Sequence, residues 1–292
     1  QMLLGETVPG ASFTVGELRL PRATLAVLAG ACFGLGGVTF QTMLRNPLAS
    51  PDVIGISTGA SAAAVVAIVV LELQGTTVSV LAIIAALATA LLIYLLSFKD
   101  GVVGTRLILV GIGIAAMLDS VVSYVLVRAA TWDLQTAMRW LTGSLNAANW
   151  DDVRLLAVAM VVAVPLLLAQ AKHLDLLQLG DDAASALGVR VERTRLLAIL
   201  GAVALIAFAT AAAGPIAFVA FLSGPIAARL VGPGGSLMVP AALTGALLVL
   251  CADLVGQFAF DARYPVGVVT GVLGAPYLVY LLIRTNRAGG SL

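Results

Sequence analysis

Apolar runs separated by short polar segments make up most of this sequence. Nine runs can be distinguished, over residues 21–43, 55–73, 76–98, 107–130, 153–171, 196–213, 215–230, 237–257 and 265–283. A helix needs about 20 apolar residues to cross the hydrocarbon core of a bilayer. The pattern therefore predicts an all-α polytopic membrane protein with about nine transmembrane helices.

The segments between the runs indicate what lies outside the bilayer or at its edge. Residues 1–19 are of mixed polarity and predict an extramembrane lead-in. Segment 45–52 contains Pro47 and Pro51, which forbid a continuous helix, so we expect a tight loop. Segment 131–152 carries three tryptophans, which favour the membrane–water interface, and it predicts a short interfacial helix.

Small residues and a proline modify two of the runs. Gly30 and Gly34 lie four residues apart in the first run, a spacing that lets helices approach closely in lipid. In the run 215–230, Gly224 and Pro225 predict a break, because proline removes a helix hydrogen bond.

Composition supports the membrane assignment and limits the chemistry. The 292 residues are 61% hydrophobic and only 11% charged, with a mean hydropathy of +1.08. Soluble domains carry about 25% charged residues, so a water-soluble protein is excluded. The net charge of +1 leaves no footprint for nucleic acid. Cys32 and Cys251 lie in apolar runs without disulfide or zinc spacing, and we expect no metal site.

The longest polar interruption is segment 176–195, LLQLGDDAASALGVRVERTR. Gly180 breaks the preceding run, Asp181 and Asp182 fill the first turn of a short helix, and Gly188 ends it. Its charges cannot be satisfied in hydrocarbon, so the segment lies outside the bilayer. A solvated loop is one interpretation, and a docking element for a cytoplasmic partner is the other.

Lysine and arginine placement predicts the orientation. Ten of the 16 basic residues fall on the side of segment 176–195 and six on the other side. Since basic residues concentrate on the cytoplasmic side, segment 176–195 and the C-terminus are predicted inside. Arg19 and Arg22 are then outside.

The stretch LGDDAASALGVRVERTR resembles the coupling helix of permease subunits of type II ABC importers, the family for iron-siderophore, haem and vitamin B12 uptake. The likeness is strongest to the ferric enterobactin type and extends from LRLPR to PVGVVTGVLGAPYLVYLLIR. It implies one transmembrane permease domain over 1–292, with the coupling helix in 176–195. Family members have ten helices, so the first one is expected to be missing from this chain.

The function implied by this resemblance is import of ferric siderophores across the bacterial cytoplasmic membrane, with haem or cobalamin as the alternative cargo. The implied partners are a second homologous permease, two ABC ATPase subunits, an extracytoplasmic substrate-binding protein and membrane lipid. A heterodimer of permeases is preferred, with a homodimer as the alternative.

Three groups of residues receive roles from the resemblance. Docking of the binding protein is implied for Arg19 and Arg22 in LRLPR; their other interpretation is anchoring at the interface. A further family arginine is replaced by Gln257, and Arg263 is its possible substitute. The cytoplasmic gate is implied for Asn46, Leu48 and Thr105; a plain proline turn is the alternative for the first two. Coupling to the ATPase is implied for Leu179, Gly180, Asp181, Asp182, Ala186, Leu187, Gly188 and Arg193.

No catalytic constellation is visible in the sequence. The single histidine, His173, follows Lys172 at the end of a run, and neither lysine has the glycine context of a P-loop. The chain is therefore predicted to bind no cofactor and not to be an enzyme, so a separate subunit would use the ATP.

Asp119 is the one acidic residue predicted near the middle of a span, where a carboxylate is costly. It either faces a translocation cavity or accepts a hydrogen bond from a hydroxyl on a neighbouring helix. The competing class of function is an ion-coupled secondary transporter. Such a transporter needs acidic residues inside the membrane as ion or proton sites, and Asp119 alone supports it. Asp253, near the end of another run, is expected to be structural.

Overall fold

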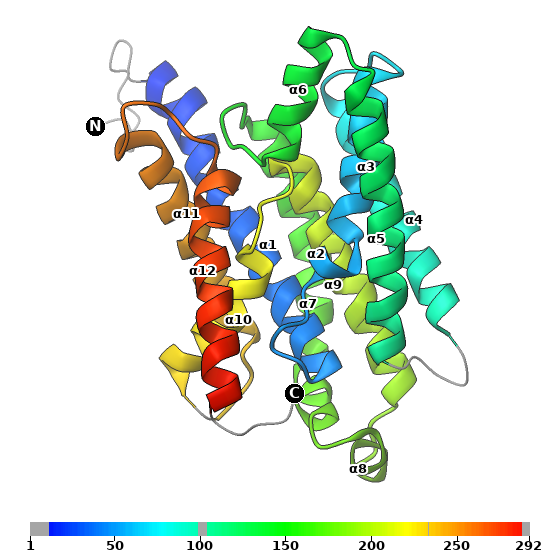
Figure 1. Ribbon diagram of the computed structural model, residues 1–292. Coiled ribbons are helices and arrows are strands. Elements are labelled where there is room, and N and C mark those ends of the chain that lie inside the picture. The colour runs from blue at the N-terminus through cyan, green and yellow to red at the C-terminus, as the bar shows by residue number, and fades with distance from the viewer. Residues whose placement is uncertain (1–11, 99–103, 233, 288–292) are drawn as a thin grey trace.

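The computed structural model describes residues 12–98, 104–232 and 234–287 of the chain. The regular elements in these ranges are helices, and the long ones lie side by side along roughly one direction (Figure 1). Their bounds are η2 (Ser12–Arg19), α1 (Leu20–Leu44), α2 (Pro51–Ile54), α3 (Ile56–Val69), α4 (Thr76–Ser97), α5 (Gly104–Val127), α6 (Thr131–Leu141), α7 (Trp150–Leu177), α8 (Asp181–Ala186), α9 (Val191–Ala213), α10 (Val219–Val231), α11 (Met238–Phe258) and α12 (Val266–Arg287).

The prediction of an all-α polytopic membrane protein is confirmed. Six of the described helices are long and apolar enough to cross a bilayer: α1 with the preceding η2, α4, α5, α7, α9 and α11. Three further apolar helices, α3, α10 and the stretch Val266–Leu281 of α12, are shorter. Each of the nine predicted apolar runs thus overlaps one of these helices.

Several boundaries differ from the sequence prediction. The described part of the lead-in, residues 12–19, is helical and continues directly into α1. The predicted run 55–73 is preceded by the one-turn helix α2, because Gly55 (φ 93°) separates α2 from α3. The interfacial helix covers only Thr131–Leu141. Helix α7 begins earlier than predicted, since the Asn149 side chain accepts hydrogen bonds from the first-turn N–H groups of residues 151 and 152.

Helix α1 lies at the centre and packs against α7, α9, α10 and α11. The predicted close approach at Gly30 and Gly34 is confirmed. A Cβ atom at Gly30 would lie 2.4 Å from the Gly245 carbonyl oxygen, and one at Gly34 would lie 2.2 Å from the Ala241 carbonyl oxygen. Only glycine allows α11 to come this near to α1.

The remaining helices form two groups beside this centre. On one side α3 contacts α4, α5 and α6, and α4 contacts α5; on the other side α10, α11 and α12 contact one another (Figure 1). Helix α8 lies at the end of the molecule opposite α6. This arrangement gives the chain two distinct ends and a space between the two groups.

Candidate functional site

The loop after α1 has a fixed backbone shape. Arg45 ends α1 with a left-handed φ of 52°, and the N–H of Asn46 donates to the Gln41 carbonyl at 3.0 Å. The Asn46 side-chain oxygen accepts from the N–H of Leu48 at 2.8 Å, an Asx turn. Residues 46–50, called the gate loop below, therefore form the predicted tight loop, while a gating role stays a prediction.

Thr105, the third predicted gate residue, is the second residue of α5 and is exposed. A Cβ at the neighbouring Gly104 would lie 2.9 Å from Leu44 Cδ2, so α5 begins against the end of α1. The structure thus brings Thr105 to the same end of α1 as the gate loop.

The short helix predicted after Gly180 is confirmed as α8. Gly180 (φ 110°) and Gly188 (φ 86°) lie on either side of it with backbone angles that favour glycine. Ala184 packs inward, whereas Leu179 and Leu187 are 64% and 59% exposed. Both leucines flank α8, so this short helix carries apolar as well as polar exposed surface.

Asp181 and Asp182 have different surroundings. The Asp181 carboxylate accepts from Arg195 Nη2 at 2.8–2.9 Å and also pairs with Arg45. Arg45 Nε in turn donates to the Leu177 carbonyl at 2.7 Å. Asp182 is exposed and makes no ion pair among the described residues. The first aspartate therefore faces the protein and the second faces solvent.

The other predicted coupling residues lie on the exposed side of this segment. Ala186 ends α8 in an exposed position, and Arg193 is exposed in the first turn of α9. Together with Leu179, Asp182 and Leu187 they form an outward surface of mixed character, called the α8 surface below.

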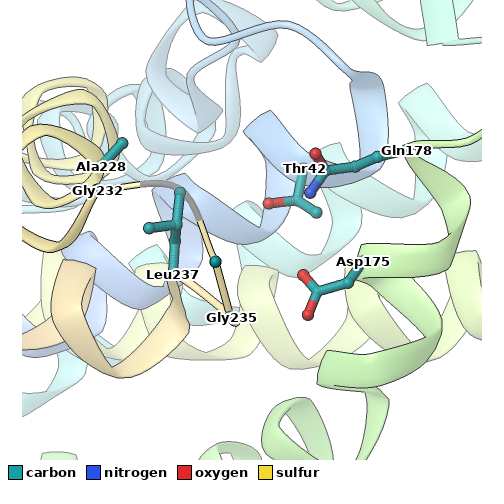
Figure 2. A pocket seen from close by; sticks show the side chains of 8 residues that line it. Thr42, Asp175, Gln178, Ala228, Gly232, Gly235 and Leu237 are labelled. Atoms are coloured by element: carbon teal, nitrogen blue, oxygen red, sulfur yellow. The ribbon is translucent and has the colours of Figure 1, made fainter.

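A polar hollow of about 280 Å³ opens at the end of α7 (Figure 2). Thr42 of α1 and Asp175 and Gln178 at the end of α7 line one side of it. Glycines and Leu237 of the connection between α10 and α11 line the other, and the Asp175 carboxylate points into the space between. Because Gln178 lies in segment 176–195, just before α8, the hollow belongs to the same end of the molecule.

A larger pocket of about 520 Å³ lies between the two helix groups. One wall is polar and comes from the gate loop, α2, α3 and α5. The other lining residues are apolar and come from the end of α6, the segment before α10, α10 and α12. The lining residues are Leu48, Ser50, Asp52, Ser57, Thr58, Ser61, Asp119, Val122, Leu141, Pro215, Ile216, Ala217, Phe218, Phe221 and Leu278.

The two carboxylates of this pocket differ. Asp52 is held by its neighbours, since Ser57 Oγ donates to it at 2.6 Å. Asp119 is exposed, and its carboxylate accepts no hydrogen bond within the ranges that the structure describes. Of the two expectations for Asp119, the structure has the side chain lining a cavity. Contact with cargo stays a prediction.

The predicted docking arginines lie at the end opposite α8, at the η2–α1 junction and in the α11–α12 connection (Figure 1). Arg19 and Arg263 are exposed. Arg22 instead makes a two-pronged ion pair with Asp253 of α11, at 2.9 Å and 2.7 Å, and donates to Asn146 at 2.6 Å. Docking stays a prediction for all three, but the Arg22 side chain already holds three segments together.

Asp253 has the structural role expected from the sequence. Its side chain is 5% exposed and is shared by Arg22 and Gln257, which donates to the same carboxylate. Gln257, noted for standing in place of a family arginine, thus adds a neutral donor to the carboxylate whose charge Arg22 balances.

The predicted break at Gly224 and Pro225 is wrong, because α10 is continuous over Val219–Val231. Pro225 has no N–H and leaves the Phe221 carbonyl without its helix partner. Gln41 Nε2 of α1 donates to that carbonyl at 3.0 Å. A Cβ at Gly224 would lie 1.9 Å from Gln41 Oε1, so glycine makes room for this contact.

Sequence reasoning missed Gln41, Arg45 and Arg195 as site residues. Gln41 lies inside an apolar run with its partner 180 residues away, and Arg45 lies 136 residues from Asp181. The sequence offers two signals: Gln41 is an amide inside an apolar run, and Arg45 directly follows that run. Neither indicates which partner it meets.

Comparisons with known proteins agree with this architecture. The sequence profile of the FecCD transport family matches residues 1–284. The ferric enterobactin transport system permease protein FepG of Escherichia coli is 43% identical over 289 residues, 98% of this chain and 87% of that protein. The achromobactin transport system permease protein CbrC of Dickeya dadantii is 40% identical over 95% of this chain and 81% of its own length.

A solved structure has the same fold along nearly the whole chain. It is an inward-facing putative metal-chelate type ABC transporter, with a TM-score of 0.88 and 30% identity. The match covers 96% of this chain and 90% of the other.

Proposed function

The chain belongs to the FecCD transport family, and we propose that it is the membrane-spanning permease subunit of an ATP-driven importer that moves ferric siderophores across the bacterial cytoplasmic membrane. The observation that carries the proposal is the similarity to the ferric enterobactin permease over 98% of this chain. An inward-facing metal-chelate ABC transporter of the same fold supports it.

We propose nine membrane-spanning units in one permease domain over residues 1–292. Six are the long apolar helices. The other three are built on α3, α10 and α12, each extended by a neighbouring segment such as α2 or the gate loop. Irregular backbone at membrane depth is tolerated where protein buries it or a cavity adjoins it, and the large pocket adjoins α2 and the start of α10.

The proposed contact with the ATPase is the α8 surface, within the coupling segment 176–195. Exposed Leu179 and Leu187 supply apolar area for docking, and exposed Asp182 supplies a charge. ATP would be bound and hydrolysed by two such ATPase subunits, and this chain would bind no cofactor. A second, homologous permease would complete the membrane part, preferably as a heterodimer.

Cargo would enter from the opposite end, where the substrate-binding protein docks. Arg19 and Arg263 offer exposed positive charge there for an acidic partner surface. The large pocket is the proposed part of the pathway contributed by this subunit. Its apolar wall and hydroxyl-lined wall carry no tight ligand set for a free ion, which suits a bulky chelate whose iron is already bound.

Reconstitution tests the proposal. The chain would be purified from native membranes with its associated proteins, placed in liposomes with the binding protein, and supplied with labelled ferric enterobactin. ATP-dependent uptake that requires the binding protein is expected. Substituting both Asp181 and Asp182 with alanine should abolish stimulation of ATP hydrolysis by cargo-loaded binding protein. Uptake driven by a proton gradient without ATP would instead indicate a secondary transporter and direct attention to Asp119.

A further inference from the structure

We infer that Arg45 is a positioning residue for transport, because its ion pair with Asp181 ties the ATPase-facing helix α8 to the gate loop. The inference rests on the proposed function and names the contact through which a displacement of α8 reaches the pathway. Arg45 belongs to none of the residue groups predicted above.

Arg45 connects α1 to the gate loop. It is the last residue before residues 46–50, and its left-handed φ of 52° sets the direction in which the loop leaves α1. Left-handed backbone is uncommon for a residue other than glycine. A movement of this residue therefore changes where the loop begins.

The side chain of Arg45 contacts segment 176–195 at two points. Its Nε donates to the Leu177 carbonyl at the end of α7, at 2.7 Å, and its Nη2 pairs with Asp181 at the start of α8. The planar guanidinium can serve both acceptors at once, which a lysine ammonium on a flexible stem does less well. One side chain thus joins three chain segments.

Asp181 is held from the other side as well. Arg195 of α9, whose side chain is only 11% exposed, donates to both carboxylate oxygens. A single exposed ion pair contributes little, but charges that share hydrogen bonds in a network of fixed geometry contribute more. Asp181, whose side chain is 44% exposed, is therefore held between Arg45 and Arg195.

A short path leads from Arg45 to the pathway. Leu48 lies three residues further on, is held by its hydrogen bond to Asn46, and lines the large pocket together with Asp119. Because Asp182 faces outward while Asp181 faces Arg45, α8 can take up a partner's displacement on one side and pass it to the gate loop on the other.

Hydrogen–deuterium exchange on the full chain in nanodiscs tests the link without transport. The Asn46 amide donates to the Gln41 carbonyl of α1, and the amides of Leu48 and Ala49 donate to Asn46, so all three report the order of the gate loop. Asp181→Asn and Arg45→Gln should each speed their exchange by about fivefold, the lower end of typical coupling between two sites. Arg190→Gln, at an exposed arginine without an ion pair among the described residues, is the matched control. Unchanged exchange in both variants would overturn the inference.

The second test measures coupling in the reconstituted complex. Arg45→Gln and Asp181→Asn should each lower cargo uptake per ATP hydrolysed by about tenfold. The double variant should lose less than the sum of the two single losses, because both single variants remove the same Arg45–Asp181 contact, whereas the bonds of Arg45 to Leu177 and of Asp181 to Arg195 are lost separately. Additive losses would overturn the inference. A wild-type complex that takes up no ferric siderophore at all would refute the proposed function instead, and the exchange result would still decide whether α8 and the gate loop are linked.

Discussion

Replacing Gln41 with leucine removes the hydrogen bond that supports α10 at its proline. Gln41 is 7% exposed, and its amide donates at 3.0 Å to the Phe221 carbonyl that Pro225 leaves unpaired. Leucine keeps much of the side-chain volume but cannot donate. The carbonyl would then stay buried without a partner.

The expected cost follows from the burial of that group. Leaving a buried carbonyl unsatisfied costs about 1–3 kcal/mol. In a domain of this size the midpoint of thermal unfolding, Tm, falls by about 2–4 °C for each kcal/mol. Phe221 lines the large pocket, so a displaced α10 should also lower uptake.

Pro225→Ala provides the decisive comparison, because an alanine N–H at position 225 can bind the Phe221 carbonyl within the helix. Gln41→Leu should therefore destabilise the Pro225→Ala variant by less than half of its effect in the natural sequence. The assay is thermal unfolding in detergent, followed by tryptophan fluorescence, with exposed Gln135→Leu as the control. An equal loss of Tm in both backgrounds would refute the reasoning.

The remaining predictions concern three charged groups. Arg22→Leu should lower the free energy of unfolding by about 3–5 kcal/mol, because it leaves the buried Asp253 carboxylate without its ion pair. Adding Asp253→Leu to this variant should recover much of the lost stability. If the double variant is no more stable than Arg22→Leu, the ion-pair account is wrong. Asp182→Ala should weaken binding of the ATPase subunit, measured by co-purification. The free energy of unfolding should change by no more than about 0.5 kcal/mol, and a larger loss would mean that Asp182 is structural. Asp119→Asn should lower the rate of siderophore uptake by about fivefold, as expected for one lost hydrogen bond of about 1 kcal/mol, while ATP hydrolysis continues; normal uptake would exclude cargo contact.

Features set by neighbouring residues could be predicted from the sequence. The two glycines and two aspartates around 180–188 define α8, and the prolines of 45–52 define a loop, because each acts on its own backbone. The apolar runs locate the helices for the same reason. The spacing of Gly30 and Gly34 alone predicts a close contact between helices, which the structure has between α1 and α11.

Features set by distant partners could not be predicted. Pro225 normally interrupts a helix, and only Gln41 on another helix lets α10 continue through it. Asp181 and Asp182 are alike in sequence, yet Arg45 and Arg195 pair with the first one, while the second makes no ion pair within the described residues. Arg22 resembles a free surface arginine until α11 brings Asp253 to it. Pairing across the fold determines which charges remain available to partners.

Uptake of labelled ferric enterobactin by liposomes that contain this chain with its co-purified subunits tests the central claim most directly. The account predicts accumulation only when ATP and the substrate-binding protein are both present, and a P-loop ATPase and a second permease among the co-purified proteins. Recovery of the chain without an ATPase, together with uptake driven by a proton gradient alone, would contradict it.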